Sequence, residues 1–136
     1  MSWAASYMGL PFKPHGRDRA GCDCWGLVRL VYAEQLGVDL PEFEGISPDD
    51  AAAIPAAIAA ETPLWTPVPL LQRQAFDVVV MRARLIREGK ALTPDMHVGV
   101  VTEDLKILHT QLPYGVACVP IDHPTLSNRI SGVFRR

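Results

Sequence analysis

Two cysteines stand one residue apart in the segment GCDCWGLVRLVYAEQLG, residues 21–37. Asp23, between them, is of a type that caps helices, and the apolar spacing after it predicts a helix from Cys24 to Leu36. Cys24 then falls in the first helical turn, where unpaired backbone N–H groups and the positive end of the helix dipole favour an anion. We therefore expect the pKa of the Cys24 thiol to fall, which makes Cys24 a candidate nucleophile.

Two histidines could supply the base that such a thiol needs. His97 opens one predicted strand, HVGVV at 97–101, and His109 lies near the end of the next, KILHT at 106–110. The tetrapeptide TEDL between these strands is short enough for a hairpin turn, which would make the two imidazoles neighbours on paired strands. One ring would face Cys24 and take its proton while the other orients it, a relay that needs no metal.

The same residues have less specific interpretations. A lone cysteine in a helix is usually small core filler, and a histidine at a strand end is more often a surface or hydrogen-bonded residue. A zinc site built from Cys22, Cys24, His97 and His109 is a further alternative. Its spacing is poor, because zinc knuckles usually place roughly two to four residues between their cysteines. We favour the nucleophile and expect neither a metal nor a cofactor.

The remaining candidate residues are expected to play structural roles. Cys22 should lie in a loop or pack in the core, and Cys118, in VACVPI, should be a buried strand residue. His15 and His123 sit beside prolines in predicted loops and should face solvent. Asp77 is expected to be a hydrogen-bonding residue at the start of a strand rather than an acid catalyst.

The elements that must position these residues follow a simple order. The helix at 24–36 should bury a stripe of Leu27, Leu30, Val31, Ala33 and Leu36 and stop at Gly37. Runs typical of strands then follow at 76–82, 97–101, 106–110, 115–121 and 130–135. Because helices do not alternate with the strands, this order predicts an α+β domain with the helix packed on an antiparallel sheet.

The length of 136 residues suits a single domain spanning 1–136. Residues 41–70 form a long proline- and alanine-rich insertion, in which we expect one short helix beginning near Ser47 or Asp49. A formal net charge of -2 lacks the basic excess typical of proteins that bind nucleic acid or anionic membranes. The amino terminus resembles neither a signal peptide nor a transmembrane helix, so we expect synthesis in the cytoplasm, and three cysteines fit a reducing compartment.

The motifs GLPF, GCDCWGLVRLVY, FDVVVM and HVGVVTEDLKILHT resemble, in order and spacing, those of the NlpC/P60 cysteine peptidases. The resemblance covers most of the chain apart from residues 41–70. It implies a papain-like α+β fold, with Cys24 as the nucleophile, His97 as the general base and His109 as the residue that holds the imidazole. It assigns substrate or oxyanion contacts to Asp23, Trp25 and Phe12.

The implied reaction is hydrolysis of a peptide bond in peptidoglycan stem peptides through a thioester acyl-enzyme, typically between D-γ-glutamyl and a diamino acid, without a cofactor. The backbone N–H of Cys24 would be the oxyanion donor. Two positions depart from the family pattern. Phe12 stands where the family commonly has Tyr, so a phenol near the site is missing, and Phe76 stands where the family often has Gly, which is expected to change only a turn.

Trp25 and the short chain without a secretion signal resemble the phage-tail and gene-transfer-agent members of this family. That resemblance implies phage tail proteins as partners and incorporation into such a particle. Two alternatives stay open: a structural tail-tip component with the same fold and little activity, and an amidase or acyltransferase that uses the same relay. The presence of Cys24, His97 and His109 together favours an active enzyme.

Overall fold

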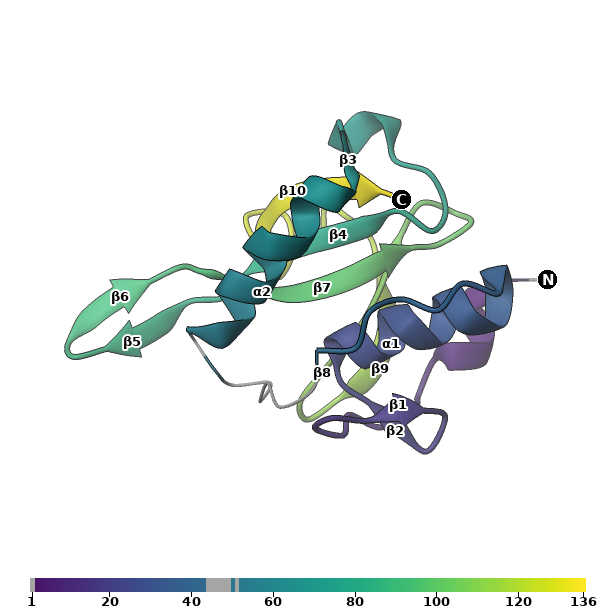
Figure 1. The fold of residues 1–136 in the computed structure, drawn as a ribbon, viewed down its shortest axis with the longest axis horizontal. Helices are drawn as coiled ribbons and strands as arrows, with labels where there is room; N and C mark the ends of the chain where they lie inside the picture. The colour runs from purple at the N-terminus through teal and green to yellow at the C-terminus, as the bar shows by residue number, and fades with distance from the viewer. Residues whose placement is uncertain (1, 44–49, 51) are drawn as a thin grey trace.

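The computed structural model describes residues 2–43, 50 and 52–136. Within these residues the chain forms two α-helices and a six-stranded antiparallel sheet, which confirms the α+β class (Figure 1). Neither helix has the length and apolar character needed to cross a membrane.

One small hairpin and both α-helices precede the main sheet in the chain, and a second small hairpin follows β4. A 3₁₀ turn at Ala4–Tyr7 precedes the hairpin of β1 (Arg17–Asp18) and β2 (Gly21–Cys22), followed by α1 (Cys24–Val31) and α2 (Ala53–Glu61). Further 3₁₀ turns lie at Thr62–Leu64 and Leu70–Gln72. A second hairpin, β5 (Leu85–Arg87) with β6 (Lys90–Leu92), projects from the body as an arm (Figure 1).

The main sheet has the strand order β3-β10-β4-β7-β8-β9. Its members are β3 (Thr66–Val68), β4 (Val78–Arg82), β7 (Asp95–Val101), β8 (Ile107–Gln111), β9 (Gly115–Val119) and β10 (Ile130–Arg135). Strands β4, β7, β8 and β9 are neighbours in this order, and the β5–β6 hairpin lies between β4 and β7 in the chain. Strand β10 pairs with the other edge of β4. The five strand runs expected from the sequence are all present, with ends that differ by up to two residues.

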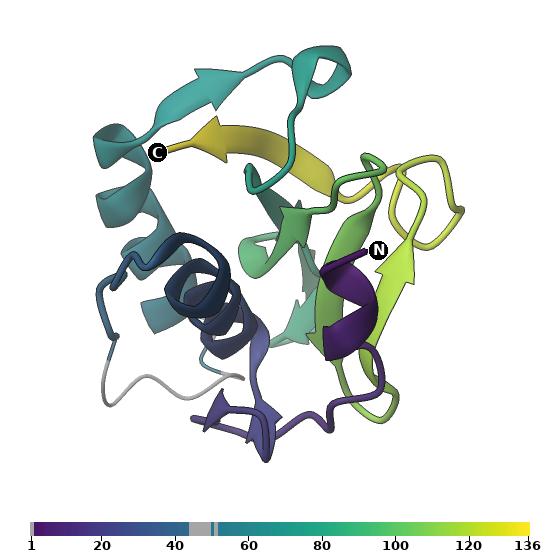
Figure 2. The same ribbon diagram turned by 90° about the vertical axis from the view of Figure 1, so that its right-hand side faces the viewer.

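Both helices lie against one face of this sheet (Figures 1 and 2). The core on this face joins Leu27 and Val28 of α1 to Val98 and Val100 of β7. A smaller core on the other face contains Val79, Met81, Val101, Ile107, Leu126 and Val133. The sheet is therefore buried on both sides, and α1 packs on β7 and β8, the strands that carry the two histidines.

The expected helix end is confirmed, but part of its expected buried stripe is wrong. After Val31 the helix continues as a π-helical turn, Tyr32–Leu36, and it ends at Gly37 with a left-handed φ of 64°. Ala33 is exposed and Leu36 is 43% exposed. The wider π-helical turn changes the angular spacing of the side chains, so the 3.6-residue stripe does not extend past Val31. Tyr32 takes over the inward position, and its hydroxyl donates to the carbonyl of Phe76.

Among the described residues of the insertion there is one α-helix, as expected. Ser47 and Asp49 lie outside the described residues. The described helix α2 begins at Ala53, where an Asp50 side-chain oxygen accepts hydrogen bonds from the N–H groups of Ala52 and Ala53. The short strands β1, β2, β3, β5 and β6 were not expected from the sequence, because strands of two or three residues are too short to show alternation.

Gly26 lies where α1 crosses the loop that precedes it. A methyl group built at Gly26 would overlap the backbone carbonyl oxygen of Gly16 and reach to 3.0 Å from Asp23 Oδ1. Backbone atoms cannot move aside as a flexible side chain can. The glycine is therefore needed for the loop to approach the helix.

We expect Gly26→Ala to lower the free energy of unfolding by about 2 kcal/mol or more, although alanine favours helix elsewhere. Urea denaturation followed by circular dichroism measures the change. Gly132→Ala is the control, because the atoms nearest to a methyl group there belong to the ring of Phe134, which can shift. Equal stability of Gly26→Ala and the unchanged protein would contradict the close approach.

Candidate active site

The histidine pair lies where β7 and β8 begin to separate. The two strands are paired at Val100–Leu108 and Val101–Ile107, and the histidines lie beyond these pairs. His97 Nε2 is 2.8 Å from His109 Nδ1, so one proton is shared between the rings. The hairpin neighbourhood expected from the sequence is confirmed.

Burial keeps both rings neutral. It lowers the pKa of His97 to about 3, and the charges of His109 and Arg129 add to this effect. Burial, together with Arg129, lowers the pKa of His109 to about 4. Two neutral imidazoles can share one hydrogen bond when His97 Nε2–H donates to His109 Nδ1, which leaves His97 Nδ1 free to accept a proton.

Cys24 is the first residue of α1 and sits at the histidine end of β7. The backbone N–H of Val98, the residue after His97, lies close enough to the thiol to favour its ionised form, as do the N–H groups of Trp25 and Cys24 itself. The helix start thus brings the sulfur to the backbone that carries His97. The polar partner of the thiol on β7 is this N–H group, while the polar partner of the His97 ring is His109.

The expected fall in the pKa of the Cys24 thiol is wrong. Burial raises this pKa to about 11, and the charge of Asp23 also raises it. The N–H groups at the helix start lower it, but they do not outweigh the loss of water around the sulfur. This raised pKa favours the protonated thiol at neutral pH in the free protein, where the Cys24 residue is half-buried.

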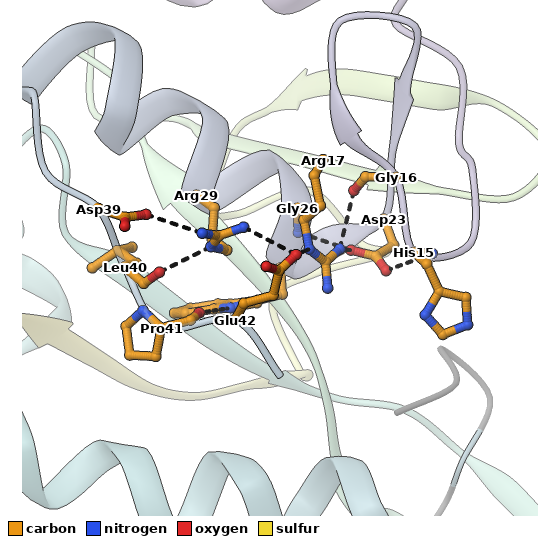
Figure 3. Close-up of polar contacts among 11 residues, drawn as sticks. His15, Gly16, Arg17, Asp23, Gly26, Arg29, Asp39, Leu40, Pro41 and Glu42 are labelled. Carbon is orange, nitrogen blue, oxygen red and sulfur yellow. Dashed lines mark hydrogen bonds and ion pairs between the residues drawn. The ribbon is translucent and has the colours of Figure 1, made fainter. Parts of the chain in front are cut away.

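Asp23 is confirmed as the cap of α1, and its carboxylate is fully engaged by the protein. Oδ1 accepts hydrogen bonds from Gly26 N at 2.8 Å and Arg17 Nη1 at 2.6 Å, while Oδ2 accepts one from His15 N at 3.0 Å (Figure 3). With these three donors in place, Asp23 holds the loop against the helix start. Its oxygens are engaged with the protein rather than with a substrate.

The other two residues assigned to substrate contacts lie in different surroundings. Trp25 borders a pocket beside Cys24, its Nε1–H donates to the carbonyl of Pro41 at 2.8 Å, and its ring tilts against Phe43. Phe12 forms a parallel β-bridge with Cys22 and does not belong to the described lining of this pocket. The structure therefore places Trp25, but not Phe12, in the described wall of the pocket beside the thiol.

The pocket beside Cys24 has a volume of about 100 Å³, the scale of a cavity that holds a benzene-sized group. Most of its wall is apolar and comes from α1, α2 and strands β4 and β7. Sequence reasoning missed the wall residues Ile54 and Ile58 of α2, because the helix falls in an insertion with no motif. It also missed Arg17, the cation in the described lining.

The structure does not support the zinc alternative. Within the described part of the chain, no three His, Cys, Asp or Glu side chains converge as metal ligands. Cys22 is fully buried on β2, and burial raises the pKa of its thiol to about 11. Cys22 is therefore a core residue and a bystander to Cys24.

The structural assignments of the other candidates are mostly confirmed. His15 and His123 are exposed. Asp77 is buried at the start of β4, where it accepts from Gln74 N–H and pairs with Arg135. Cys118 is only half-buried on β9, so the expectation of a fully buried residue is wrong.

The neutral histidine pair predicts a pH-dependent stability. The unfolded histidines take up protons near pH 6.5, whereas the folded rings stay neutral to about pH 4 and 3. The unfolded state therefore binds more protons below pH 6.5, and the free energy of unfolding must fall as the pH drops from 7 to 5. Urea denaturation at several pH values in this window measures the slope while most carboxylates stay ionised.

The double variant His97→Gln/His109→Gln should lose most of this slope, and the exposed His123→Gln should keep it. The same slope in the double variant and the unchanged protein would contradict the neutral pair.

The NlpC/P60 family model matches residues 9–135. A solved structure of a protein similar to a lipoprotein of the NLP/P60 family, from Staphylococcus aureus, has a TM-score of 0.64 and 20% identity over 97% of this chain and 38% of that one. The NlpC/p60 domain of the peptidoglycan hydrolase SagA has a TM-score of 0.61 and 20% identity over 98% of this chain and 92% of that one.

No curated protein sequence matches this chain. The chain spans little more than a third of the Staphylococcus aureus protein, and at 20% identity both solved structures show the fold alone. The family match extends over nearly the whole chain and includes Cys24, His97 and His109. The chain belongs to the NlpC/P60 family.

Proposed function

We propose that this protein is a cysteine endopeptidase that hydrolyses peptide bonds in peptidoglycan stem peptides. The observation that carries the proposal is the hydrogen-bonded pair of His97 and His109 at the end of β7 where α1 presents Cys24. A nucleophile, a base and a group that orients the base are the parts of a thiol peptidase. Membership of the NlpC/P60 family supports a cell-wall substrate.

The reaction we propose begins with a neutral site. The Cys24 thiol gives its proton to His97 Nδ1 as the sulfur attacks the scissile carbonyl carbon. The resulting oxyanion lies at the start of α1, where the backbone N–H of Cys24 is the proposed donor. His97 then donates its proton to the leaving amine, and a thioester to Cys24 remains. Water attacks this thioester with His97 as the base, which releases the acid and restores the thiol.

His109 is a positioning residue in this scheme. When His97 accepts the thiol proton, its Nε2–H continues to donate to His109 Nδ1, now as a charged donor, and such hydrogen bonds are stronger than neutral ones. The imidazolium is thus stabilised in the transition state and not in the resting protein. This order fits the low pKa of His97, because the buried ring carries charge only while the substrate reacts.

The bond we propose is the one between D-γ-glutamyl and a diamino acid. Support comes from the resemblance of the catalytic motifs to the family and from the fold shared with a domain of a peptidoglycan hydrolase. We also propose a setting in a phage tail or gene-transfer agent, with tail proteins as partners. That part rests on the sequence alone, on Trp25 after the nucleophile.

Digestion of purified stem peptides that contain the γ-D-glutamyl–diamino acid bond tests the proposal, with products identified by mass spectrometry. Cys24→Ala should reduce turnover by at least about 10³-fold, because it removes the nucleophile, while leaving the fold intact. Cys118→Ala is the matched control, because this half-buried cysteine lies on β9 and not at the start of α1; it should keep full turnover.

Equal turnover in Cys24→Ala and the unchanged protein would refute the mechanism. No cleavage by the unchanged protein, with peptides of several peptidoglycan types, would favour the alternative of a tail-tip component with little activity.

A further inference from the structure

Arg17 brings a positive charge to the pocket that contains Cys24. It is the cation among the described lining residues, and the other charged groups there, Asp23 and Glu61, are engaged by protein donors. Asp23 caps α1, and Glu61 accepts from the indole of Trp65 at 3.0 Å. Any anionic group of a ligand in this pocket would therefore meet Arg17.

The guanidinium of Arg17 is only partly engaged. Nη1 donates to Asp23 Oδ1 at 2.6 Å and to the carbonyl of Gly16 at 3.0 Å. Nε is buried and has no hydrogen-bond partner among the described residues. A buried N–H donor without an acceptor is energetically costly, so a ligand acceptor at this edge of the guanidinium would be stabilised.

Glu42 provides a weak counter-ion at this edge. Its Oε1 lies 3.4 Å from Arg17 Nε and 3.4 Å from Arg29 Nη1, so one carboxylate sits between two guanidinium groups (Figure 3). The Glu42 side chain is 40% exposed, and its contact with Nε does not form a hydrogen bond. Exposed ion pairs of this kind contribute at most about 1 kcal/mol. A ligand carboxylate with better geometry could displace Glu42.

We propose that Arg17 binds the free α-carboxylate of a γ-glutamyl residue on the acyl side of the scissile bond, and that Glu42 occupies this subsite in the free protein. This inference rests on the proposed function, because it names the substrate group that the pocket selects. The α-carboxylate of a γ-glutamyl residue is separated from the scissile carbonyl by a short chain of three carbons. Arg17 and Cys24 line the same pocket, so one ligand there could contact both residues.

The subsite makes the protein selective for charge. A carboxylate accepts hydrogen bonds from a guanidinium with the strength of a charged pair, whereas the α-amide of the same residue offers one neutral oxygen. The mostly apolar wall around Arg17 lowers the local dielectric constant and strengthens this difference. Stem peptides with a free α-carboxylate should therefore bind more tightly than their α-amidated forms.

Calorimetric binding to the full-length Cys24→Ala protein tests this inference without requiring hydrolysis. The probes are L-Ala-γ-D-Glu-diamino acid tripeptide and the same tripeptide with the glutamyl α-carboxylate amidated. We expect the acid to bind at least about tenfold more tightly than the amide. Adding Glu42→Gln to the Cys24→Ala protein should lower the Kd of the acid tripeptide about threefold or more, because it removes the competing carboxylate. The Kd of the amidated tripeptide should stay unchanged.

Arg17→Gln should abolish the preference for the acid, and Arg29→Gln is its matched control. Arg29 also contacts Glu42 but does not belong to the described pocket lining, so Arg29→Gln should keep the preference. Because Arg17 also holds Asp23, circular dichroism must show that Arg17→Gln is folded; otherwise Glu42→Gln decides. Equal binding of acid and amide, binding of neither, or an acid affinity unaffected by Glu42→Gln would overturn the inference. Cleavage of both peptides at equal rates by the unchanged protein would uphold the peptidase and overturn only the subsite.

Discussion

The carboxylate of Asp23 is the interaction on which the arrangement of the site depends. It caps α1 through Gly26 N–H, binds the guanidinium of Arg17 and accepts a hydrogen bond from His15 N–H. One buried group thereby fixes the start of the helix and the loop that crosses it. Because Cys24 follows Asp23 directly, the same contacts set the position of the thiol against β7. Gly26 makes this possible by leaving room for the carbonyl of Gly16.

Burial governs the electrostatics of the site. The start of a helix and three nearby N–H groups favour a thiolate at Cys24, yet burial raises the thiol pKa to about 11. The same loss of water lowers the pKa of His97 to about 3. Both effects favour the neutral forms, so Cys24 and His97 do not form a thiolate–imidazolium pair in the resting protein. In the mechanism that we propose, charge separates only when a substrate carbonyl is attacked, at the point where the oxyanion donors and His109 can stabilise it.

The sequence predicted those parts of the molecule that depend on local patterns. The cap at Asp23, the stop at Gly37 and the neighbourhood of His97 and His109 follow from residue types and spacing over a few positions. The exposure of Leu36 could not be predicted, because it follows from a π-helical turn in which Tyr32 hydrogen-bonds to the distant Phe76 carbonyl, and no local pattern indicates such a turn. Arg17 and α2 lie at the site because of tertiary contacts, which local sequence patterns do not indicate. The pKa of Cys24 likewise depends on burial, which no local motif encodes.

The central claim is that the resting thiol of Cys24 is protonated. It is tested by measuring, as a function of pH, the rate at which iodoacetamide alkylates Cys24, with the modified residue identified by peptide mass spectrometry. A free thiol with a pKa near ~8.5, in a peptide reacted in parallel, provides the reference. The account predicts slow labelling at pH 6 to 8 and a rate that keeps rising with pH beyond the point where the free thiol has levelled off. A rate at Cys24 that levels off below pH 8 would show a thiolate in the resting protein and contradict the account.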